Sequence, residues 1–315
     1  MKVLITGANG FIGRSILSTN INGISYRLVV RNTYENFPNL HETVFLNSIS
    51  SETHWSEIIE NIDAIVHLAG RAHVLRKGGI DPSSEYQKVN VDGTINLVKQ
   101  AILAGVKRFI FMSSIKVNGE TTSKDHPFTP EDKENPRDPY AESKYKAEKE
   151  LIRLTQREKM DYVILRPTLV YGSGVKANFL SLVKWIKKSL PLPFGAVRNL
   201  RSFLAVENLV DFIHLCLKHN SAANQIFLVS DVAPISTSQL VEKIKLSTGS
   251  SSLNIPVNSN LLRIIFRLIG RKELSWRLLD SMVVDISKNK NLLGWKPATL
   301  IEESLKLTSE NLDNK

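Results

Sequence analysis

Met1-Lys-Val-Leu-Ile-Thr-Gly-Ala-Asn-Gly-Phe-Ile-Gly13 opens the chain with a short apolar run followed directly by a glycine-rich turn. Lys2–Thr6 is β-branched and nearly continuous in apolar character, which predicts a buried strand. The turn contains three glycines at intervals of three residues, Gly7, Gly10 and Gly13. Such glycines let the backbone approach a pyrophosphate closely, and the helix predicted over Ile12–Ser18 would point free N–H groups at that anion. This order of elements predicts the first unit of a dinucleotide-binding fold.

Short apolar runs alternate with longer helical patterns through the first half of the chain. Further strands are predicted over Tyr26–Arg31, Thr43–Asn47, Ala64–Ala69, Arg108–Ser113 and Tyr162–Pro167. Further helices are predicted over Thr53–Glu60, Glu85–Leu103 and Ala141–Gln156. Alternation of this kind is typical of a parallel sheet with helices on both faces. The predicted fold class is therefore α/β, with a Rossmann-type doubly wound parallel sheet.

The regular alternation stops after Pro167. The later elements are helices over Phe179–Ser189 and Val206–His219, a strand over Gln225–Val229, and helices opened at Leu240 and Ile301 by the capping boxes Ser236-Thr-Ser-Gln239 and Thr299-Leu-Ile-Glu302. This pattern predicts a dinucleotide-binding domain over residues 1–167. A smaller, mostly helical substrate lobe is predicted over residues 168–315, with some of its elements returning to the first domain.

Composition limits the class of protein. Lys and Arg total 41 against 31 Asp and Glu, and the resulting charge of +10 favours anionic partners. The charges are scattered with no run of five like charges, which argues against nucleic acid, and no cluster of metal ligands is seen. The single cysteine, Cys216, suits a reducing compartment. No stretch reaches the roughly 18 apolar residues of a membrane span, and no signal peptide precedes the first strand. We therefore expect a cytoplasmic protein without an integral membrane segment.

Asn260–Arg271, with the sequence NLLRIIFRLIGR, combines an apolar majority with basic interruptions. One interpretation is a helix that lies on an anionic membrane. The other is a buried helix of the second lobe whose arginines reach solvent or a phosphate. The second interpretation is favoured because amphipathic helices usually face a protein core.

The residue that ends the second strand of a dinucleotide-binding fold selects the cofactor. An acidic side chain there accepts hydrogen bonds from the ribose hydroxyls, whereas a basic one pairs with the extra 2′-phosphate of NADP(H). Here the strand is followed by Arg31-Asn32. A guanidinium grips a phosphate through two parallel bonds, so NADP(H) is the predicted preference and NAD the alternative.

Tyr140 and Lys144 lie four residues apart and share one face of a predicted helix. An ammonium beside a phenol favours the phenolate, so we expect Lys144 to lower the pKa of Tyr140 and make it an acid or base near neutral pH. Ser113-Ser114 ends a strand at the sheet edge where ligands bind, and Ser114 is the preferred donor to the same substrate oxygen. Asn90 is expected to fix cofactor-contacting backbone or water.

Two histidines lie close to the glycine that is expected to contact the cofactor. His67 and His73 flank Gly70, and both are predicted to bond backbone at the cofactor edge rather than to ligate a metal.

As a set, these motifs resemble the extended short-chain dehydrogenase/reductase family that acts on nucleotide sugars. The matching segments are Thr6–Gly13, His67–Gly70, Asn90–Thr94, Ser113-Ser114, Tyr140–Lys144, Arg166-Pro167, Leu169–Gly172, Asn178–Leu180 and Arg201–Phe203. The resemblance covers nearly the whole chain and weakens after Val257. It implies that Tyr140 is the catalytic acid/base, that Lys144 is its partner and a ribose ligand, and that Ser114 donates to the substrate oxygen.

The resemblance also implies binding residues. With the reasoning above, cofactor contacts are expected at Gly7, Gly10, Phe11, Ile12, Gly13, Arg31, Leu68, Ala69, Gly70, Asn90, Tyr140, Lys144 and Pro167. Contacts to a UDP-sugar are expected at Ser114, Asn178, Pro193, Phe194 and Arg201. Candidates for a second diphosphate-binding arginine are Arg263, Arg271 and Arg277. Members of the family often pair through two long helices, so a homodimer through Glu85–Leu103 and Ala141–Gln156 is expected.

Three functions remain open at this point. The family's 4-epimerases carry acidic residues where Arg31 and Ser48 stand and a small hydroxyl residue where Lys116 stands. These departures resemble NADPH-dependent C4 reductases of a UDP-4-keto-6-deoxy-N-acetylhexosamine in bacterial surface-polysaccharide biosynthesis, which is the leading prediction. The alternative is an NAD-dependent UDP-glucose or UDP-N-acetylglucosamine 4-epimerase. A non-catalytic NAD(P) sensor is a remote alternative, because a pure binder has no need of a proton donor. The sugar, the C4 stereochemistry and the oligomeric state are left open.

Overall fold

The computed structural model describes residues 1–19, 21–31, 41–72, 82–123 and 125–313. The chain forms two compact units, each assembled from separate segments. The first consists of Met1–Gly119, Lys133–Arg166 and Val210–Phe227, and the second of Glu120–Asp132, Pro167–Leu209 and Leu228–Lys315. The predicted boundary lies after residue 167. The structure differs in two places: Glu120–Asp132 belongs to the second unit, and Val210–Phe227 belongs to the first.

A seven-stranded sheet forms the core of the fold, in the order β3-β2-β1-β4-β5-β6-β9. Its strands are β1 (Lys2–Thr6), β2 (Ser25–Val30), β3 (Glu42–Phe45), β4 (Ala64–His67), β5 (Arg108–Met112), β6 (Asp161–Pro167) and β9 (Gln225–Val229). The pairs from β3 through β6 are all parallel. The predicted Rossmann-type α/β fold is confirmed. The strand order reverses between β1 and β4, and ligands of such sheets bind beyond the carboxyl ends of the strands at this point.

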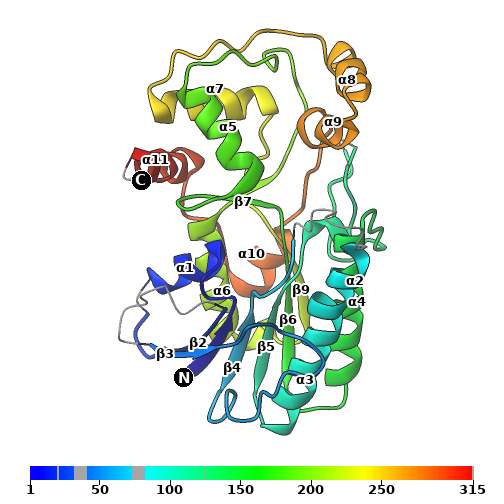
Figure 1. The fold of residues 1–315 in the computed structure, drawn as a ribbon, viewed down its shortest axis with the longest axis vertical. Helices are drawn as coiled ribbons and strands as arrows, with labels where there is room; N and C mark the ends of the chain where they lie inside the picture. The colour runs from blue at the N-terminus through cyan, green and yellow to red at the C-terminus, as the bar shows by residue number, and fades with distance from the viewer. Residues whose placement is uncertain (20, 32–40, 73–81, 124, 314–315) are drawn as a thin grey trace. The chain divides into compact units, whose positions relative to one another are not determined.

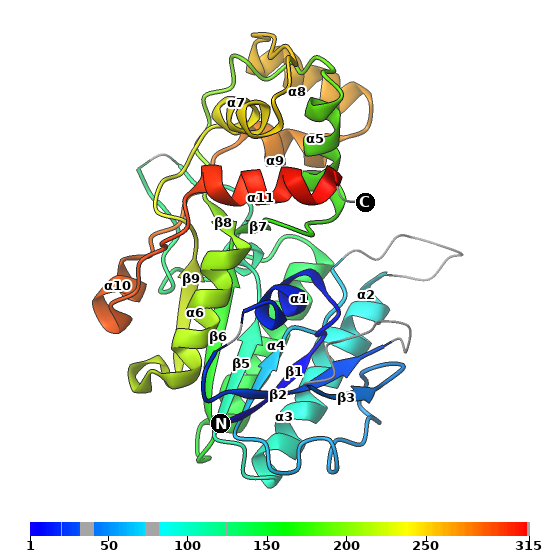
Figure 2. The same ribbon diagram turned by 90° about the vertical axis from the view of Figure 1, so that its left-hand side faces the viewer.

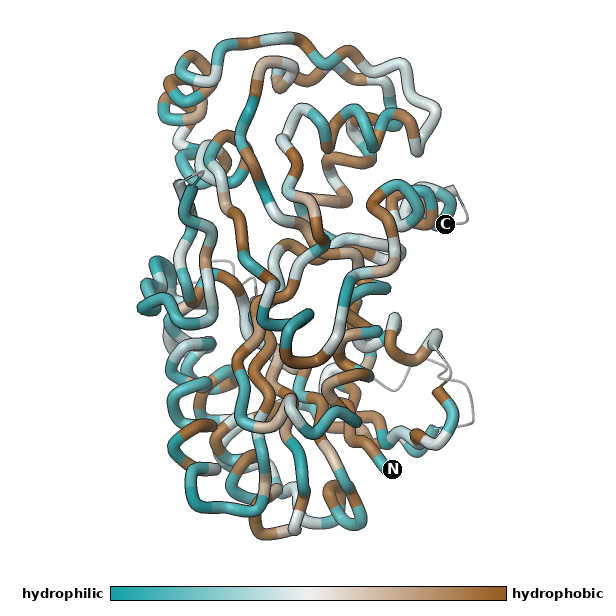
Figure 3. The backbone as a smooth tube through the Cα atoms, turned by 180° about the vertical axis from the view of Figure 1, so that it is seen from behind, coloured by the Kyte–Doolittle hydropathy of each residue, from teal (hydrophilic) through white to brown (hydrophobic). Residues whose placement is uncertain are grey.

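Helices cover both faces of the sheet, which explains the apolar strands. Figures 1 and 2 show α3 (Gly93–Leu103) and α4 (Pro139–Thr155) along one face, and α1 (Phe11–Leu17) and α6 (Val206–Lys218) on the other. Every residue of β5 is buried, and the strands are mostly brown in Figure 3. A strand covered on both sides loses little by carrying apolar residues at every position.

The late segment is tied into the first unit by an arginine of β5. The Arg108 guanidinium donates to the carbonyl oxygens of Cys216 at 2.6 Å and His219 at 3.0 Å, and also pairs with Asp161 at 2.7 Å. Tyr26 and His214 add a buried hydrogen bond of 2.9 Å between β2 and α6. These long-range contacts place α6 against strands from the beginning of the chain.

The predicted helix over Thr53–Glu60 is wrong. This stretch forms irregular turns whose backbone groups bond to side chains from elsewhere. The Arg27 guanidinium donates to the carbonyls of Ile58 at 2.7 Å and Glu60 at 3.0 Å, while Gln100 accepts from the Trp55 N–H at 2.8 Å. Because these partners satisfy the backbone, the segment does not need helical hydrogen bonds.

The predicted helix over Glu85–Leu103 is interrupted by a π-helical turn. It consists of α2 (Pro82–Tyr86), the π-helix η1 (Gln87–Asp92) and α3. Asn90 lies within the π-helical turn and is buried. Wide turns of this kind occur frequently at functional sites.

The second unit is mostly helical. It contains the strands β7 (Leu169–Tyr171) and β8 (Phe203–Ala205) and the helices α5 (Ala177–Lys187), α7 (Thr237–Thr248), α8 (Ser259–Leu268), α9 (Lys272–Leu279), α10 (Ser287–Leu293) and α11 (Ile301–Asp313). The capping box at Ser236 and Gln239 is present, so α7 begins directly after Ser236 rather than at Leu240. At α11 Glu303 accepts from the Leu300 N–H at 3.1 Å, one residue later than the predicted capping box at Glu302.

The favoured interpretation of Asn260–Arg271 as a buried helix is also wrong. Within this segment α8 ends at Leu268 and the chain turns at Gly270, which has a φ of +70°, before α9 begins at Lys272. Of the ten residues of α8, Leu262 is buried. Among the described residues, none of the helices combines the length and apolar character needed to cross a bilayer.

Candidate active site

The glycine turn lies between β1 and α1, at the point where the strand order reverses. Gly7 has a φ of +71°, and a Cβ there would come within 2.9 Å of the Ala69 backbone nitrogen. A Cβ at Gly13 would lie 2.5 Å from the Ala8 carbonyl oxygen. Gly10 precedes α1, and no side chain of the described residues caps that helix. The turn therefore has the close backbone packing and free N–H groups of a dinucleotide cradle, which Phe11 and Ile12 would complete.

The turn after β4 approaches the same point. It contains Leu68, Ala69 and Gly70, and the Ala69 N–H donates to the Thr6 hydroxyl at 3.2 Å. His67, at the end of β4, bonds Thr6 at 2.7 Å through Nδ1 and Thr94 at 3.0 Å through Nε2. Burial, with a smaller contribution from the Lys144 charge, lowers the pKa of His67 to about 3.

His67 is therefore a neutral structural residue. Since the Thr94 hydroxyl donates to the Asn90 carbonyl, it accepts the proton of His67 Nε2. The prediction that His67 bonds backbone is wrong, because both its ring nitrogens bond threonine hydroxyls. His73 lies outside the described residues.

Asn90 connects the β4 turn to α4. Its Oδ1 accepts from the Arg71 N–H at 2.8 Å, and its Nδ2 donates to the Arg71 carbonyl and to the Ser143 hydroxyl, each at 3.0 Å. A Cβ at Gly70 would lie 3.1 Å from Lys144 Nζ and 3.2 Å from Asn90 Oδ1. The backbone of this turn is thus fixed directly beside the lysine.

The start of α4 positions Tyr140. Asp138 caps the helix by accepting from the Ala141 N–H at 2.7 Å, and Tyr140 follows in the first turn. Ser114, just beyond β5, hydrogen-bonds Tyr140. The edge of the Tyr86 ring lies against the Tyr140 ring, with centroids 6.0 Å apart. Because parallel strands end at one edge, the structure brings Ser114, Tyr140 and the glycine turn into the same unit at the same sheet edge.

The pKa values differ from the prediction. Burial raises the pKa of Tyr140 to about 12, and the hydrogen bond with Ser114 opposes this rise. The Lys144 amine does not lower it, since that amine donates to the Met112 carbonyl at 2.9 Å and lies 4.7 Å from the Phe111 ring centroid. Burial lowers the pKa of Lys144 to about 8, and the Glu148 charge opposes that shift. In this state Tyr140 is a protonated phenol.

A buried ion pair between Glu148 of α4 and Arg166 of β6 lies next to Ser113. This pair was not predicted from the sequence. Arg166 is fully buried and donates to Glu148 through Nε at 3.0 Å and through Nη2 at 2.6 Å. Asn118 accepts from Arg166 Nη1 at 2.9 Å. The Ser113 hydroxyl donates to Glu148, so Ser113 is engaged by this cluster while its neighbour Ser114 bonds Tyr140. The spacing was a usable signal, because Glu148 follows Lys144 by four residues on the same helix face.

A stability measurement tests the buried lysine. The pKa of Lys144 is lowered in the folded protein relative to its ordinary value of 10.5, so the charged form destabilises the fold below about pH 8. This penalty is relieved as pH rises from about 8 to 10.5, where the unfolded chain holds the proton longer. We expect Lys144→Met to be more stable than wild type at pH 7. The difference in the free energy of unfolding between the variant and wild type should narrow as pH rises from about 8 to 10.5, by less than about 1.4 kcal/mol per pH unit.

Chemical denaturation at pH 7, 8, 9 and 10 checks this prediction. The Lys146→Met variant is the matched control, because Lys146 lies on the same helix but is about half exposed. A Lys144 difference that stays constant with pH would show that its amine is not penalised by burial.

The second unit holds the predicted substrate residues. Arg201 is buried and donates to the carbonyls of Trp276 at 3.2 Å and Asp280 at 3.0 Å. Burial lowers the pKa of Arg201 to about 10. The Glu120 and Asp280 charges oppose this shift, and the Arg277 charge makes the smallest contribution, in the same direction as burial. Of the three other candidates, Arg263 pairs with Asp280 and Arg271 is exposed. Arg277 is therefore the arginine whose charge acts on Arg201.

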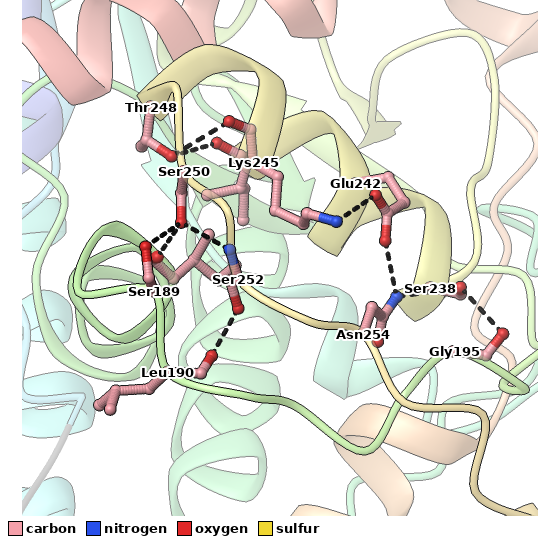
Figure 4. A network of polar contacts seen from close by, with 12 residues as sticks. Ser189, Leu190, Gly195, Ser238, Glu242, Lys245, Thr248, Ser250, Ser252 and Asn254 are labelled. Atoms are coloured by element: carbon pink, nitrogen blue, oxygen red, sulfur yellow. Dashed lines mark hydrogen bonds and ion pairs between the residues drawn. The ribbon is translucent and has the colours of Figure 1, made fainter.

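A network of polar contacts holds the Pro193-Phe194 segment (Figure 4). Ser252 donates to the Leu190 carbonyl at 2.5 Å, and Ser238 donates to the Gly195 carbonyl at 3.3 Å. Between these anchors the Leu192 N–H donates to the Leu253 carbonyl at 2.8 Å. Phe194 is buried and Pro193 is partly buried.

Three further predicted site residues lie at the surface or at the end of a strand. Asn178 is exposed in the first turn of α5, and Pro167 is buried at the end of β6. Arg31 is exposed directly after β2. No partner of the Arg31 side chain is seen among the described residues, which do not include residues 32–40.

Comparisons with known proteins agree with this arrangement. The model of the NAD dependent epimerase/dehydratase family matches residues 3–230. A UDP-glucose 4-epimerase of Vibrio cholerae is 40% identical over 98% of this chain and 94% of its own length. An N-acetyl-α-D-glucosaminyl-diphospho-ditrans,octacis-undecaprenol 4-epimerase of Escherichia coli O157:H7 is 27% identical over 86% of this chain and 82% of its own.

A solved structure extends the comparison to the fold. The UDP-glucose 4-epimerase of Thermotoga maritima, crystallised with UDP-glucose, superimposes with a TM-score of 0.79 at 24% identity. The match covers 100% of this chain and 99% of that one.

Proposed function

The chain belongs to the NAD dependent epimerase/dehydratase family, and from this premise we propose that it is a UDP-sugar 4-epimerase that uses NAD. The observation that carries the proposal is the 40% identity to a UDP-glucose 4-epimerase over nearly the whole of both chains. The hydrogen bond between Ser114 and Tyr140 and the position of the Lys144 amine beside Gly70 support it. The relatives thus favour the epimerase alternative over the NADPH-dependent reductase that the sequence alone puts first.

Tyr140 is the proposed acid and base of the reaction. Its phenolate form accepts the proton of the C4 hydroxyl and its phenol form returns that proton to the C4 oxygen, while Ser114 donates a hydrogen bond to that same oxygen. The Lys144 amine, beside Gly70, is the proposed ligand of the cofactor ribose. NAD held at the glycine turn would supply a reversible acceptor for the C4 hydride. Gly7 and Gly13 let the turn pack closely on the backbone of Ala69 and Ala8, and this packing shapes the cradle proposed to hold the cofactor pyrophosphate.

Arg201 and Arg277 are the proposed ligands of the diphosphate. The Arg277 charge adds to the effect of burial on Arg201, while the Glu120 and Asp280 charges oppose it. A dianionic diphosphate would neutralise both guanidinium groups, which explains why such a pair is useful. Asn178, Pro193 and Phe194 are proposed to complete the nucleotide site.

An assay of C4 inversion tests the function. Purified protein is incubated separately with UDP-glucose and UDP-N-acetylglucosamine, and the sugar ring is followed by proton NMR while the cofactor released on denaturation is identified. We expect the C4 epimer of at least one sugar to accumulate without net production of NADH. No interconversion, together with NADPH consumption on a UDP-4-keto-6-deoxy-N-acetylhexosamine, would replace the epimerase with the reductase.

Arg31 keeps the reductase as a second candidate. It is an exposed guanidinium at the end of β2, where a 2′-phosphate would approach. If the protein is an NADPH-dependent reductase, it should bind NADPH about ten- to a hundredfold more tightly than NADH, because charge-assisted bonds contribute roughly 1.5–3 kcal/mol. Arg31→Asp should then abolish or invert the preference. Isothermal titration with both cofactors checks this, and equal affinities in wild type would favour the epimerase.

A further inference from the structure

The helix α8 exposes an apolar face. Leu261, Ile264, Ile265 and Leu268 are 50%, 56%, 41% and 80% exposed. They are separated by three or four residues and therefore share one side of the helix. Ile269, which follows directly, is 60% exposed. Leucine and isoleucine gathered on one exposed side mark an interaction surface rather than the scatter expected of a solvated helix.

The segment that carries this face is well anchored in the second unit. Leu262 is buried on the inner side of α8, and Asn258 caps the helix by accepting from the Asn260 N–H at 2.8 Å. Arg263 of α8 forms an ion pair with Asp280 beyond α9. The exposed side chains therefore do not result from a helix end that has lost its packing.

Positive charge surrounds the apolar face. Arg267 of α8, Arg271 in the turn that follows it and Lys272 at the start of α9 are all exposed. Over Ser259–Leu279 the basic residues are Arg263, Arg267, Arg271, Lys272 and Arg277, while the one acidic residue is Glu273. An apolar protein partner would gain little from this excess, whereas an anionic surface would be attracted to it.

An aromatic residue lies in the adjoining helix. Trp276 of α9 is 47% exposed. Tryptophan is enriched where an apolar layer meets water, because its ring is amphipathic. Apolar side chains on one face, basic residues beside them and a half-exposed tryptophan together have the composition of a helix that lies in a lipid interface.

We propose that the α8–α9 surface, formed by Leu261, Ile264, Ile265, Leu268, Ile269 and Trp276 with Arg267, Arg271 and Lys272, docks the protein on the surface of a bilayer rich in anionic phospholipid. The apolar side chains enter the boundary between headgroups and acyl chains, and the basic ones pair with lipid phosphates. Binding is peripheral and reversible. This property goes beyond the proposed reaction and does not depend on it.

Flotation with lipid vesicles tests the proposal. The full-length protein is mixed with vesicles of phosphatidylcholine alone and with vesicles containing 30% phosphatidylglycerol, and the floated fraction is measured against lipid concentration. We expect binding to the anionic vesicles that weakens as salt is added. Ile264→Glu/Leu268→Glu should weaken it about a hundredfold, since removal of each apolar side chain costs about a factor of ten.

Two further variants separate the contributions. Leu103→Glu/Leu246→Glu makes the same charge change at leucines that are 86% and 82% exposed on other helices, and it should keep most of the binding. Arg267→Gln/Arg271→Gln should weaken binding to anionic vesicles about 25-fold, because each charge contributes about fivefold. Circular dichroism confirms that each variant is folded.

Light scattering distinguishes a second copy of the chain from the membrane. If Ile264→Glu/Leu268→Glu lowers the molar mass in solution and wild type does not float with anionic vesicles, the surface is a protein interface and the proposal is wrong. Equal flotation of the α8 variant and its leucine control would also overturn it.

Discussion

Replacing Tyr140 with phenylalanine should lower kcat by a factor of about 10²–10⁴ while leaving the affinity for the cofactor nearly unchanged. The substitution removes one hydroxyl, which is the group proposed to exchange a proton with the C4 oxygen. The ring keeps its edge contact with Tyr86, so the packing around the site is retained. The loss should therefore appear in the chemical step rather than in folding or binding.

A second tyrosine on the same helix provides the control. Tyr145 is partly buried and lies under the Lys149 amine, at 5.5 Å from the ring centroid, so its hydroxyl has no proposed role in the reaction. Tyr145→Phe should leave kcat within a factor of two or so of wild type, since such a general acid or base contributes far more than that. Steady-state kinetics and cofactor titration measure both variants. A Tyr140→Phe enzyme with wild-type kcat would remove this residue from the mechanism.

Replacing Glu148 with alanine should destabilise the protein by about 3–5 kcal/mol. The variant leaves the Arg166 guanidinium, which is fully buried, without its main counter-charge. Glu134 also approaches Arg166, at 3.3 Å, but it is partly exposed and compensates incompletely. The Ser113 hydroxyl loses its acceptor in the same step. An uncompensated charge in the core costs far more than an ion pair contributes at the surface.

Glu150→Ala is the matched control on α4. Glu150 also pairs with an arginine, Arg153, at 2.7 Å, but this pair lies at the surface, where water and salt screen it. Urea denaturation of the two variants should show a large loss for Glu148 and a change near experimental error for Glu150. Similar losses for both would mean that burial does not set the cost of breaking the Arg166 pair.

The parts of the fold that depend on local signals were predicted well from the sequence. A strand covered on both faces is apolar along its whole length, and β1 is found at its predicted residues. The glycine turn was predicted because only glycine tolerates the φ of Gly7 and the close approach to Ala69. Thr53–Glu60 was mispredicted because its backbone partners, Arg27 and Gln100, are distant in the sequence.

The sequence predicts that Ser114 and Tyr140 come together, and they form a hydrogen bond, but it does not predict the electrostatics around them. Ser114 and Tyr140 meet because strands of a parallel sheet end at one edge, which a strand assignment is enough to predict. The pKa of Tyr140 depends on how deeply the surrounding chain buries it, and spacing carries no such information. The Glu148–Arg166 ion pair joins a helix to a strand that follows it in the chain, so the pattern within either element does not reveal it. The helical pattern of α8 likewise does not reveal whether its apolar side faces a protein core or the surface.

The segmental composition of the first unit has a consequence for its biosynthesis. A ribosome makes the chain from the amino terminus, yet Val210–Phe227 completes this unit only after the Pro167–Leu209 stretch of the second unit has been made. Until then Arg108 lacks the carbonyls of Cys216 and His219, and β6 is an open sheet edge. A nascent chain of 167 residues therefore holds all the proposed acid–base residues but not the contacts that close their unit. Such a chain exposes β6 as an unpaired strand edge until β9 has been made.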